Sequence, residues 1–95
     1  MVRVVFSFDV EPERQEEYLR ATEERIKPYW ESHGCLSYQV WQAEGSTKFI
    51  KEMLFRDMAS KEKTMAMKDE ESNSIRALWR SFVKEVSIET HIRKA

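Results

Sequence analysis

The sequence contains few of the residues that build loops, crosslinks or membrane spans. Only two of its 95 residues are Gly and two are Pro, which leaves little material for long loops or linkers. The single cysteine, Cys35, excludes an intramolecular disulfide and is typical of a reduced, cytoplasmic protein. No apolar run reaches the length of a transmembrane helix, and the apolar start at residues 1–6 is too short for a signal peptide. We therefore expect one cytoplasmic domain over residues 1–95, without membrane contact.

Neither sign of charge dominates the chain. Its 16 Lys and Arg residues nearly balance 17 Asp and Glu residues, and the net charge of −1 provides no general attraction to nucleic acid or to an anionic membrane. Two His and one Cys at no recognisable ligand spacing argue against a metal site. A chain this short buries a modest fraction of its surface, so association with a second copy is a natural source of further stability.

Hydrophobic periodicity predicts four strands and three helices. Alternating apolar residues indicate strands at 2–10, 35–42, 47–56 and 86–92, with a turn at Glu44-Gly45-Ser46 that makes the middle two a hairpin. Helices are expected from 12 to about 32, from 58 to about 67, and from 72 or 73 to about 86. The last of these has the strongest 3–4 spacing of apolar residues.

Local signals set the expected helix ends. Asp57 is a suitable N-cap for the short helix, and Ser72 or Asn73 is the candidate cap for the last one. Pro28 removes a backbone donor and should kink or break the first helix just before it. The buried stripe of that helix is expected to contain Leu19, Ile26, Tyr29 and Trp30.

The order of elements is βαββαβ, with the second helical region split in two. Right-handed connections in this order give a ferredoxin-like α+β fold, a four-stranded antiparallel sheet with its helices on one face. The other face would carry Val5, Trp41, Ile50 and Leu54. Such an exposed apolar patch is unusual for a monomer, so we expect a homodimer in which two copies pack sheet to sheet.

Two motifs carry a family resemblance. The first is His33-Gly34-Cys35-Leu36-Ser37-Tyr38 between the first helix and the second strand, and the second is Glu52-Met53-Leu54-Phe55-Arg56-Asp57 leading into the short helix. With the element order, they make nearly the whole chain resemble the antibiotic biosynthesis monooxygenase (ABM)-like family of the dimeric α/β-barrel superfamily. The resemblance implies a sheet-to-sheet dimer with a small-molecule pocket. Known members include cofactor-free quinol and polyketide oxygenases, haem-degrading enzymes and an isomerase.

The sequence departs from this family at its best-known chemical positions. Where oxygenases and haem degraders often have a Trp at the end of the third strand, this chain has Phe55. The histidine of the haem degraders falls near Met65, and the asparagine near the end of the first strand corresponds to Ser7 or Asp9. The resemblance therefore implies the pocket without haem degradation.

The corner at residues 33–35 contains a thiol and an imidazole close together in sequence. Gly34 is expected to end the helix in a left-handed conformation. Cys35 is interpreted as a small buried residue, because a nucleophilic thiol needs a base within reach and a lowered pKa. His33 at the helix end is a candidate for acid–base chemistry, and the alternative is a surface or helix-capping histidine.

The preferred hypothesis is a cofactor-independent monooxygenase, or a related isomerase, acting on a small aromatic or quinol-like molecule. An electron-rich phenolate can itself reduce O₂ if a dry pocket favours the anion and a side chain takes the proton. The candidate catalytic residues are His33, Tyr38 and Tyr29. The candidate substrate-binding residues are apolar or aromatic: Phe6, Phe8, Trp41, Phe55, Met65 and Trp79.

Two other function classes are weighed against it. A non-catalytic small-molecule-binding dimer would use the same pocket, and the missing Trp and His favour it. RNA binding shares the βαββαβ order, but residues 47–55 lack the glycine spacing of the RNP pattern and the charge is nearly neutral, so no nucleic acid is expected.

Overall fold

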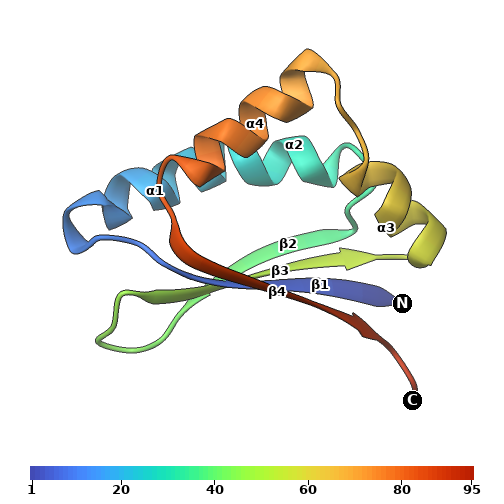
Figure 1. Cartoon of the computed structure of the whole chain (residues 1–95), viewed down its shortest axis with the longest axis horizontal. Helices are drawn as coiled ribbons and strands as arrows, with labels where there is room; N and C mark the ends of the chain where they lie inside the picture. Colours follow the sequence, from blue (N-terminus) through green and yellow to red (C-terminus); the bar gives the residue numbers. More distant parts are fainter.

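The computed structural model describes all 95 residues as a four-stranded antiparallel sheet whose helices lie on one face (Figure 1). The strands are β1 (Val2–Asp9), β2 (Ser37–Gln42), β3 (Lys48–Phe55) and β4 (Lys84–Ile92), and their order across the sheet is β2-β3-β1-β4. The α-helices are α1 (Gln15–Ala21), α2 (Lys27–Glu31), α3 (Met58–Met65) and α4 (Glu70–Arg80). The predicted ferredoxin-like architecture is confirmed.

The alternation read from the first strand gives the observed orientation of its side chains. Val2, Val4, Phe6 and Phe8 are all buried on the face covered by the helices, here called the inner face. The same two-residue period buries Phe49 and Met53 of β3, since paired residues of neighbouring antiparallel strands share a face. The hydrophobic core therefore lies between the inner face and the helices.

The first helix is continuous in direction but irregular in hydrogen bonding. A short 3-10 turn (Pro12–Arg14) precedes α1, and a π-helical segment (Thr22–Ile26) separates α1 from α2. Pro28 lies in the first turn of α2, directly after this π-helical segment, which confirms the predicted disturbance. Ile26, Tyr29 and Trp30 are buried as expected.

Leu19 is a correction to the predicted stripe, because 41% of it is exposed. The π-helical segment inserts an extra residue per turn after Ala21, so the helical phase that buries Ile26 and Trp30 does not extend back to Leu19.

The last helix differs from the prediction at both ends. It is capped by Asp69, whose carboxylate accepts a hydrogen bond from the Ser72 N–H at 3.2 Å, and not by Ser72 or Asn73. It ends at Arg80, so Phe82, Val83 and Val86 lie outside it. Strand pairing explains why the helix ends earlier than predicted. β4 begins at Lys84, opposite Asp9, and its backbone pairs with the N–H and C=O groups along the edge of β1. Asp57 caps α3 as predicted, through the Ser60 N–H at 2.8 Å.

The C-terminal end of the first helix confirms the prediction for Gly34. Its φ is +102°, and the Cys35 N–H donates to the Trp30 carbonyl at 3.1 Å, the long-range hydrogen bond of a Schellman ending. A Cβ at Gly34 would lie 2.5 Å from Thr64 Oγ1. Both the conformation and the approach of α3 therefore require glycine here.

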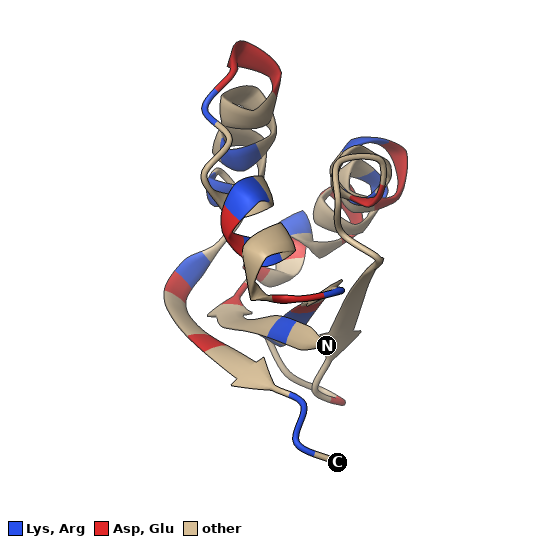
Figure 2. Ribbon diagram, turned by 90° about the vertical axis from the view of Figure 1, so that its right-hand side faces the viewer, with Lys and Arg blue, Asp and Glu red and all other residues tan.

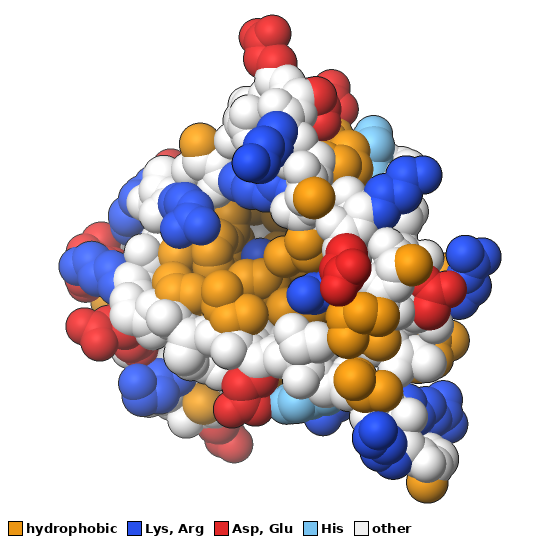
Figure 3. Space-filling view, turned by 45° about the vertical axis from the view of Figure 1, so that its right-hand side comes forward, with side chains coloured by type: hydrophobic (Ala, Val, Ile, Leu, Met, Phe, Trp, Pro, Cys, Tyr) orange, Lys and Arg blue, Asp and Glu red, His pale blue; other side chains and the backbone are white.

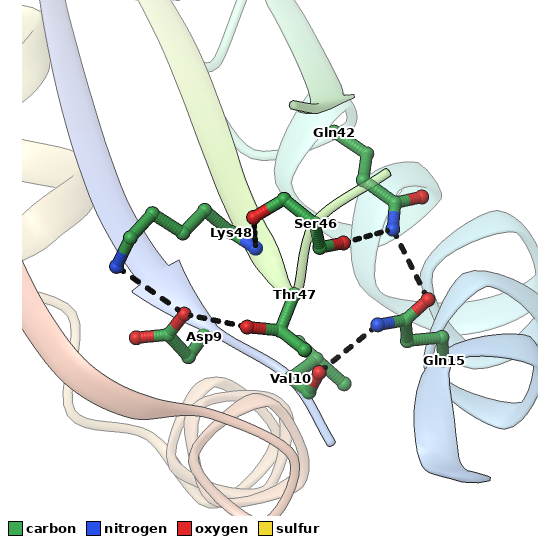
Figure 4. A network of polar contacts seen from close by, with 7 residues as sticks. All are labelled: Asp9, Val10, Gln15, Gln42, Ser46, Thr47 and Lys48. Atoms are coloured by element: carbon green, nitrogen blue, oxygen red, sulfur yellow. Dashed lines mark hydrogen bonds and ion pairs between the residues drawn. The ribbon is translucent and has the colours of Figure 1, made fainter. Parts of the chain in front are cut away.

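A polar network joins the β2–β3 turn to the start of the first helix (Figure 4). The Gln15 side chain donates to the Val10 carbonyl at 3.1 Å and accepts from Gln42 at 3.1 Å. Thr47 donates to the Asp9 carboxylate at 3.0 Å. These contacts fix the end of the sheet away from α3.

The face of the sheet opposite the helices, here called the outer face, carries the expected apolar residues. Trp41 is 60% exposed and pairs across the strands with Ile50, which is 44% exposed. Val5 and Leu54 lie on the same face and are half-buried. The outer face also carries a polar chain in which Arg3 donates to His91 at 3.0 Å and to Glu52 at 3.2 Å.

Lys and Arg as well as Asp and Glu residues are distributed along the helices (Figure 2). None of the helices combines the length and the apolar character needed to cross a lipid bilayer.

Candidate functional site

A cavity of about 220 Å³ opens between the inner face of the sheet and helices α3 and α4, here called the Lys51 cavity. Figure 3 shows a hollow with hydrophobic side chains on its floor and Lys or Arg side chains at its edge and within it. The lining is mostly apolar or aromatic, with three cationic side chains: Phe6, Trp30, Lys51, Met53, Met65, Arg76, Trp79, Arg80 and Ile88. This combination of an apolar body with a few polar groups is the usual composition of a small-molecule site.

Lys51 lies in the cavity because of its position in β3. It falls between Phe49 and Met53 on the inner face, so the two-residue period directs it toward the helices. Only 5% of Lys51 is exposed. Its Nζ lies 3.7 Å from the ring centroid of Trp79 and 4.0 Å from that of Phe6, and it makes no hydrogen bond or ion pair with the protein.

Burial changes the protonation of this amine. Removal from water disfavours the ammonium form and lowers the pKa of Lys51 from 10.5 to about 7. Cys35 opposes this shift, and the positive charges of Arg80 and Arg76 add to it. Near neutral pH a substantial fraction of Lys51 is therefore the free amine, which is both a base and a nucleophile.

The two arginines of the cavity have different roles. Arg76 donates to the carbonyls of Met65 at 3.1 Å and Thr64 at 3.4 Å, so it closes the C-terminal end of α3. Its guanidinium carbon also lies 5.1 Å from the ring centroid of Trp30. Arg80 forms no hydrogen bond or ion pair, and no acidic side chain lines the cavity. The site is therefore suited to an aromatic molecule that is an anion or becomes one.

Several residues predicted from the sequence as substrate contacts lie at this cavity or directly behind it. Phe6, Met65 and Trp79 line it. Phe8 packs behind Trp79, with ring centroids 5.3 Å apart, and Phe55 is fully buried in the core. The position that resembles the family's Trp is thus filled by a side chain that packs in the core and does not line the cavity.

Tyr38 is the one candidate catalytic residue next to Lys51. Its ring centroid lies 5.5 Å from Lys51 Nζ, and its buried hydroxyl has no hydrogen-bond partner. Burial raises the pKa of Tyr38 well above its usual value, so the hydroxyl is a donor at neutral pH.

The remaining candidates lie elsewhere. The His33 ring stacks on Tyr29 with centroids 4.1 Å apart, and its Nδ1 lies 2.7 Å from the Tyr29 carbonyl, in a separate surface depression beside Thr64. Tyr29 is buried among the helices, and Trp41 is on the outer face of the sheet. None of the three lines the Lys51 cavity.

Cys35 has the environment of a packed residue. It is 2% exposed, its Sγ donates to the Ser37 carbonyl at 3.1 Å, and burial raises the pKa of the thiol. This geometry disfavours the thiolate.

Sequence reasoning did not single out Lys51, although the signal was present. In the run Phe49-Ile50-Lys51-Glu52-Met53 the lysine occupies an inward position of a strand whose other inward residues are apolar. A cation at such a position is an exception to the binary pattern, and exceptions of this kind mark functional sites. No three His, Cys, Asp or Glu side chains come close enough together to ligate a metal ion.

The fold defines a small α+β domain, and comparison with known proteins identifies its family. The family model "Antibiotic biosynthesis monooxygenase" matches residues 1–66, so the chain belongs to the ABM family. No curated protein matches the sequence.

Solved structures with the same fold are numerous. The crystal structure of an antibiotic biosynthesis monooxygenase is 15% identical, with all of both chains covered and a TM-score of 0.76. A conserved protein from Methanosarcina mazei is 23% identical, with 98% of this chain and 92% of that chain covered and a TM-score of 0.77. A Mycobacterium tuberculosis protein is 15% identical, with 99% and 95% covered and a TM-score of 0.74.

Proposed function

We propose that this protein is a cofactor-independent monooxygenase, or a related isomerase, that acts on a small phenolic or quinol-like molecule in the Lys51 cavity. The observation that supports it is a buried lysine without an ion pair in an aromatic cavity of an ABM-family chain. Both reactions begin with removal of a proton from the substrate, which is the step that a free amine performs.

The oxygenation needs no electron source other than the substrate. The Lys51 amine accepts the phenolic proton, and the resulting ammonium, with Arg80, stabilises the phenolate. The anion transfers one electron to O₂, and the ring radical and superoxide combine, with one proton, to form a hydroperoxide at a ring carbon that still carries hydrogen. Loss of water from that carbon leaves a carbonyl, so one oxygen atom enters the product and the other leaves as water.

The size of the cavity supports a small substrate. A cavity of about 150 Å³ in a protein core holds benzene. The Lys51 cavity, at about 220 Å³, accommodates one substituted ring or a compact pair of fused rings. Tetracyclic molecules are too large for it.

The same proposal includes a homodimer formed through the outer face. Trp41 and Ile50 are the most exposed apolar residues there, whereas Val5 and Leu54 are already half-buried. Burying the exposed fractions of these four side chains supplies about 4 kcal/mol per protomer. The two protomers together contribute about 8 kcal/mol against the cost of association, so other contacts of the outer face must add to these four for a dimer at micromolar concentration.

The test is oxygen consumption with a panel of hydroquinones and hydroxynaphthalenes. We expect wild type to consume O₂ with at least one of them and Lys51→Met to lose about 10²-fold or more of the rate, the usual value of a general base. Lys68→Met, an exposed lysine between α3 and α4, is the matched control and should leave the rate unchanged. His33→Ala should also retain activity, because His33 lies outside the cavity.

A non-catalytic binding protein is the alternative, favoured by the burial of Phe55 and by the position of both histidines outside the cavity. It predicts that phenolic ligands raise the melting temperature of wild type by mass action and that none is consumed. That result would refute the oxygenase and leave the binding site intact.

A further inference from the structure

The Lys51 amine has the surroundings of a nucleophile as well as those of a base. It points into a cavity, it has no protein partner that would have to be broken first, and apolar or aromatic side chains surround it. The cations Arg76 and Arg80 line the same cavity. A desolvated lysine beside other cations is the arrangement that frees an amine for reaction with carbonyl groups.

We propose that Lys51 forms an imine with small aromatic aldehydes or ketones that enter the cavity and carry an anionic substituent. Nζ attacks the carbonyl carbon to give a carbinolamine, and loss of its hydroxyl group as water leaves the C=N bond. The amine loses two hydrogens to that water, so no oxidant or reductant is consumed. Tyr38, whose ring centroid lies 5.5 Å from Nζ and whose buried hydroxyl has no partner, is proposed to donate a proton to the departing hydroxyl.

The cavity selects the carbonyl compound by its ring and its charge. Phe6 and Trp79 lie next to the amine as an edge-to-face pair, with centroids 5.5 Å apart and planes at 71°, and this aromatic surface favours an aromatic compound. Arg80 has no partner in the protein and lines the same cavity, so it is available to pair with a carboxylate on that ring. This activity is distinct from oxygenation, because it requires neither O₂ nor an ionisable hydroxyl on the substrate.

Competition with surface lysines favours Lys51. At neutral pH an ordinary exposed lysine is almost fully protonated, whereas the pKa of Lys51 is about 7. The free-amine fraction of Lys51 is then about 10³-fold larger than that of an exposed lysine. Brief labelling at pH 7 should therefore be selective.

The experiment is reductive trapping of the intact protein at pH 7 with 4-formylbenzoate and sodium cyanoborohydride, followed by intact mass and peptide mapping. We expect one adduct, on the peptide containing Lys51, with labelling at least about tenfold above that of any other lysine. Mapping also separates it from an adduct at the N-terminal amine. Neutral benzaldehyde should label Lys51 less than 4-formylbenzoate does.

Three variants distinguish the possible causes. Lys51→Met removes the amine, so it should lose the adduct while remaining folded by circular dichroism. Arg80→Gln should abolish the preference for 4-formylbenzoate over benzaldehyde, and Lys68→Met should change nothing. Labelling spread evenly over surface lysines, or equal labelling of wild type and Lys51→Met, would overturn the proposal. Oxygen consumption without a Lys51 adduct would refute the imine alone, and an adduct without oxygen consumption would refute the oxygenase alone.

Discussion

The buried amine of Lys51 should make the protein less stable than it would be with an apolar residue there. Lys51→Met keeps an unbranched side chain of similar length and removes the charge. In the unfolded chain the amine has its ordinary pKa of 10.5, and in the folded protein the pKa is about 7. Between these values the unfolded state binds more protons, so the free energy of unfolding of wild type rises with pH over this window.

The magnitude follows from the same two values. The difference between the pKa values of 10.5 and about 7 lowers the free energy of unfolding of wild type by about 5 kcal/mol at pH 6, at about 1.4 kcal/mol per pKa unit. The contacts of the ammonium with Phe6 and Trp79 are already part of this net difference. We therefore expect Lys51→Met to be about 5 kcal/mol more stable than wild type at pH 6. At pH 10, where the folded state is neutral and the unfolded state is still mostly protonated, the gain should fall to about 1 kcal/mol.

Urea unfolding followed by circular dichroism at the two pH values measures both quantities, with Lys68→Met as the control. The control should stay within about 0.5 kcal/mol of wild type at each pH, as expected for an exposed position. If Lys51→Met is less stable than wild type at pH 6, or if its gain is the same at pH 6 and pH 10, the reasoning on Lys51 is wrong.

Three further predictions concern other parts of the molecule. Trp41→Glu would place an unpaired charge on the outer face and should convert a dimer to a monomer. Size-exclusion chromatography with light scattering at a few micromolar measures this, and a wild-type mass near the 11.4 kDa of one chain would contradict the dimer. Gly34→Ala combines a φ of +102° with a clash against Thr64 and should lower the free energy of unfolding by about 2–3 kcal/mol. Gly45→Ala, at φ +68° with open space around it, should lower it by about 1 kcal/mol. Equal losses in the two variants would refute the role of the clash. Hemin titration should give no Soret band typical of His ligation, because the cavity is lined by Met65 and contains no histidine. A stoichiometric His-type band would contradict this.

Elements with strong periodicity could be predicted from the sequence. The alternation of β1 gave both its extent and its buried face, and Asp57 identified the start of α3. The corner at Gly34 was predictable because only glycine adopts a left-handed ending without strain.

The failures have physical causes that single-sequence patterns do not contain. The apolar spacing of Ile75, Leu78, Trp79, Phe82 and Val83 continues past Arg80, but pairing with β1 overrides helical propensity from Lys84 onward. Leu19 was misplaced because the π-helical segment changes the helical phase without any distinctive residue.

The candidate site was only partly accessible to the same reasoning. Aromatic residues suggested a pocket, and Phe6 and Trp79 do line it. His33 attracted attention as a histidine near a cysteine, yet the helix end turns it away from the cavity. The burial of Lys51 depends on three-dimensional packing, because Trp79 of α4 and Phe6 of β1 cover its amine together.

The pH dependence of oxygen consumption tests the central claim, that the free amine of Lys51 accepts the substrate proton, most directly. With a hydroxynaphthalene as substrate, kcat/KM of wild type should rise with pH through a midpoint near 7, the pKa of Lys51 in the free protein, and level off above it. Lys51→Met should retain only a small rate without that midpoint. A profile with the same midpoint and the same plateau in both proteins would contradict the account.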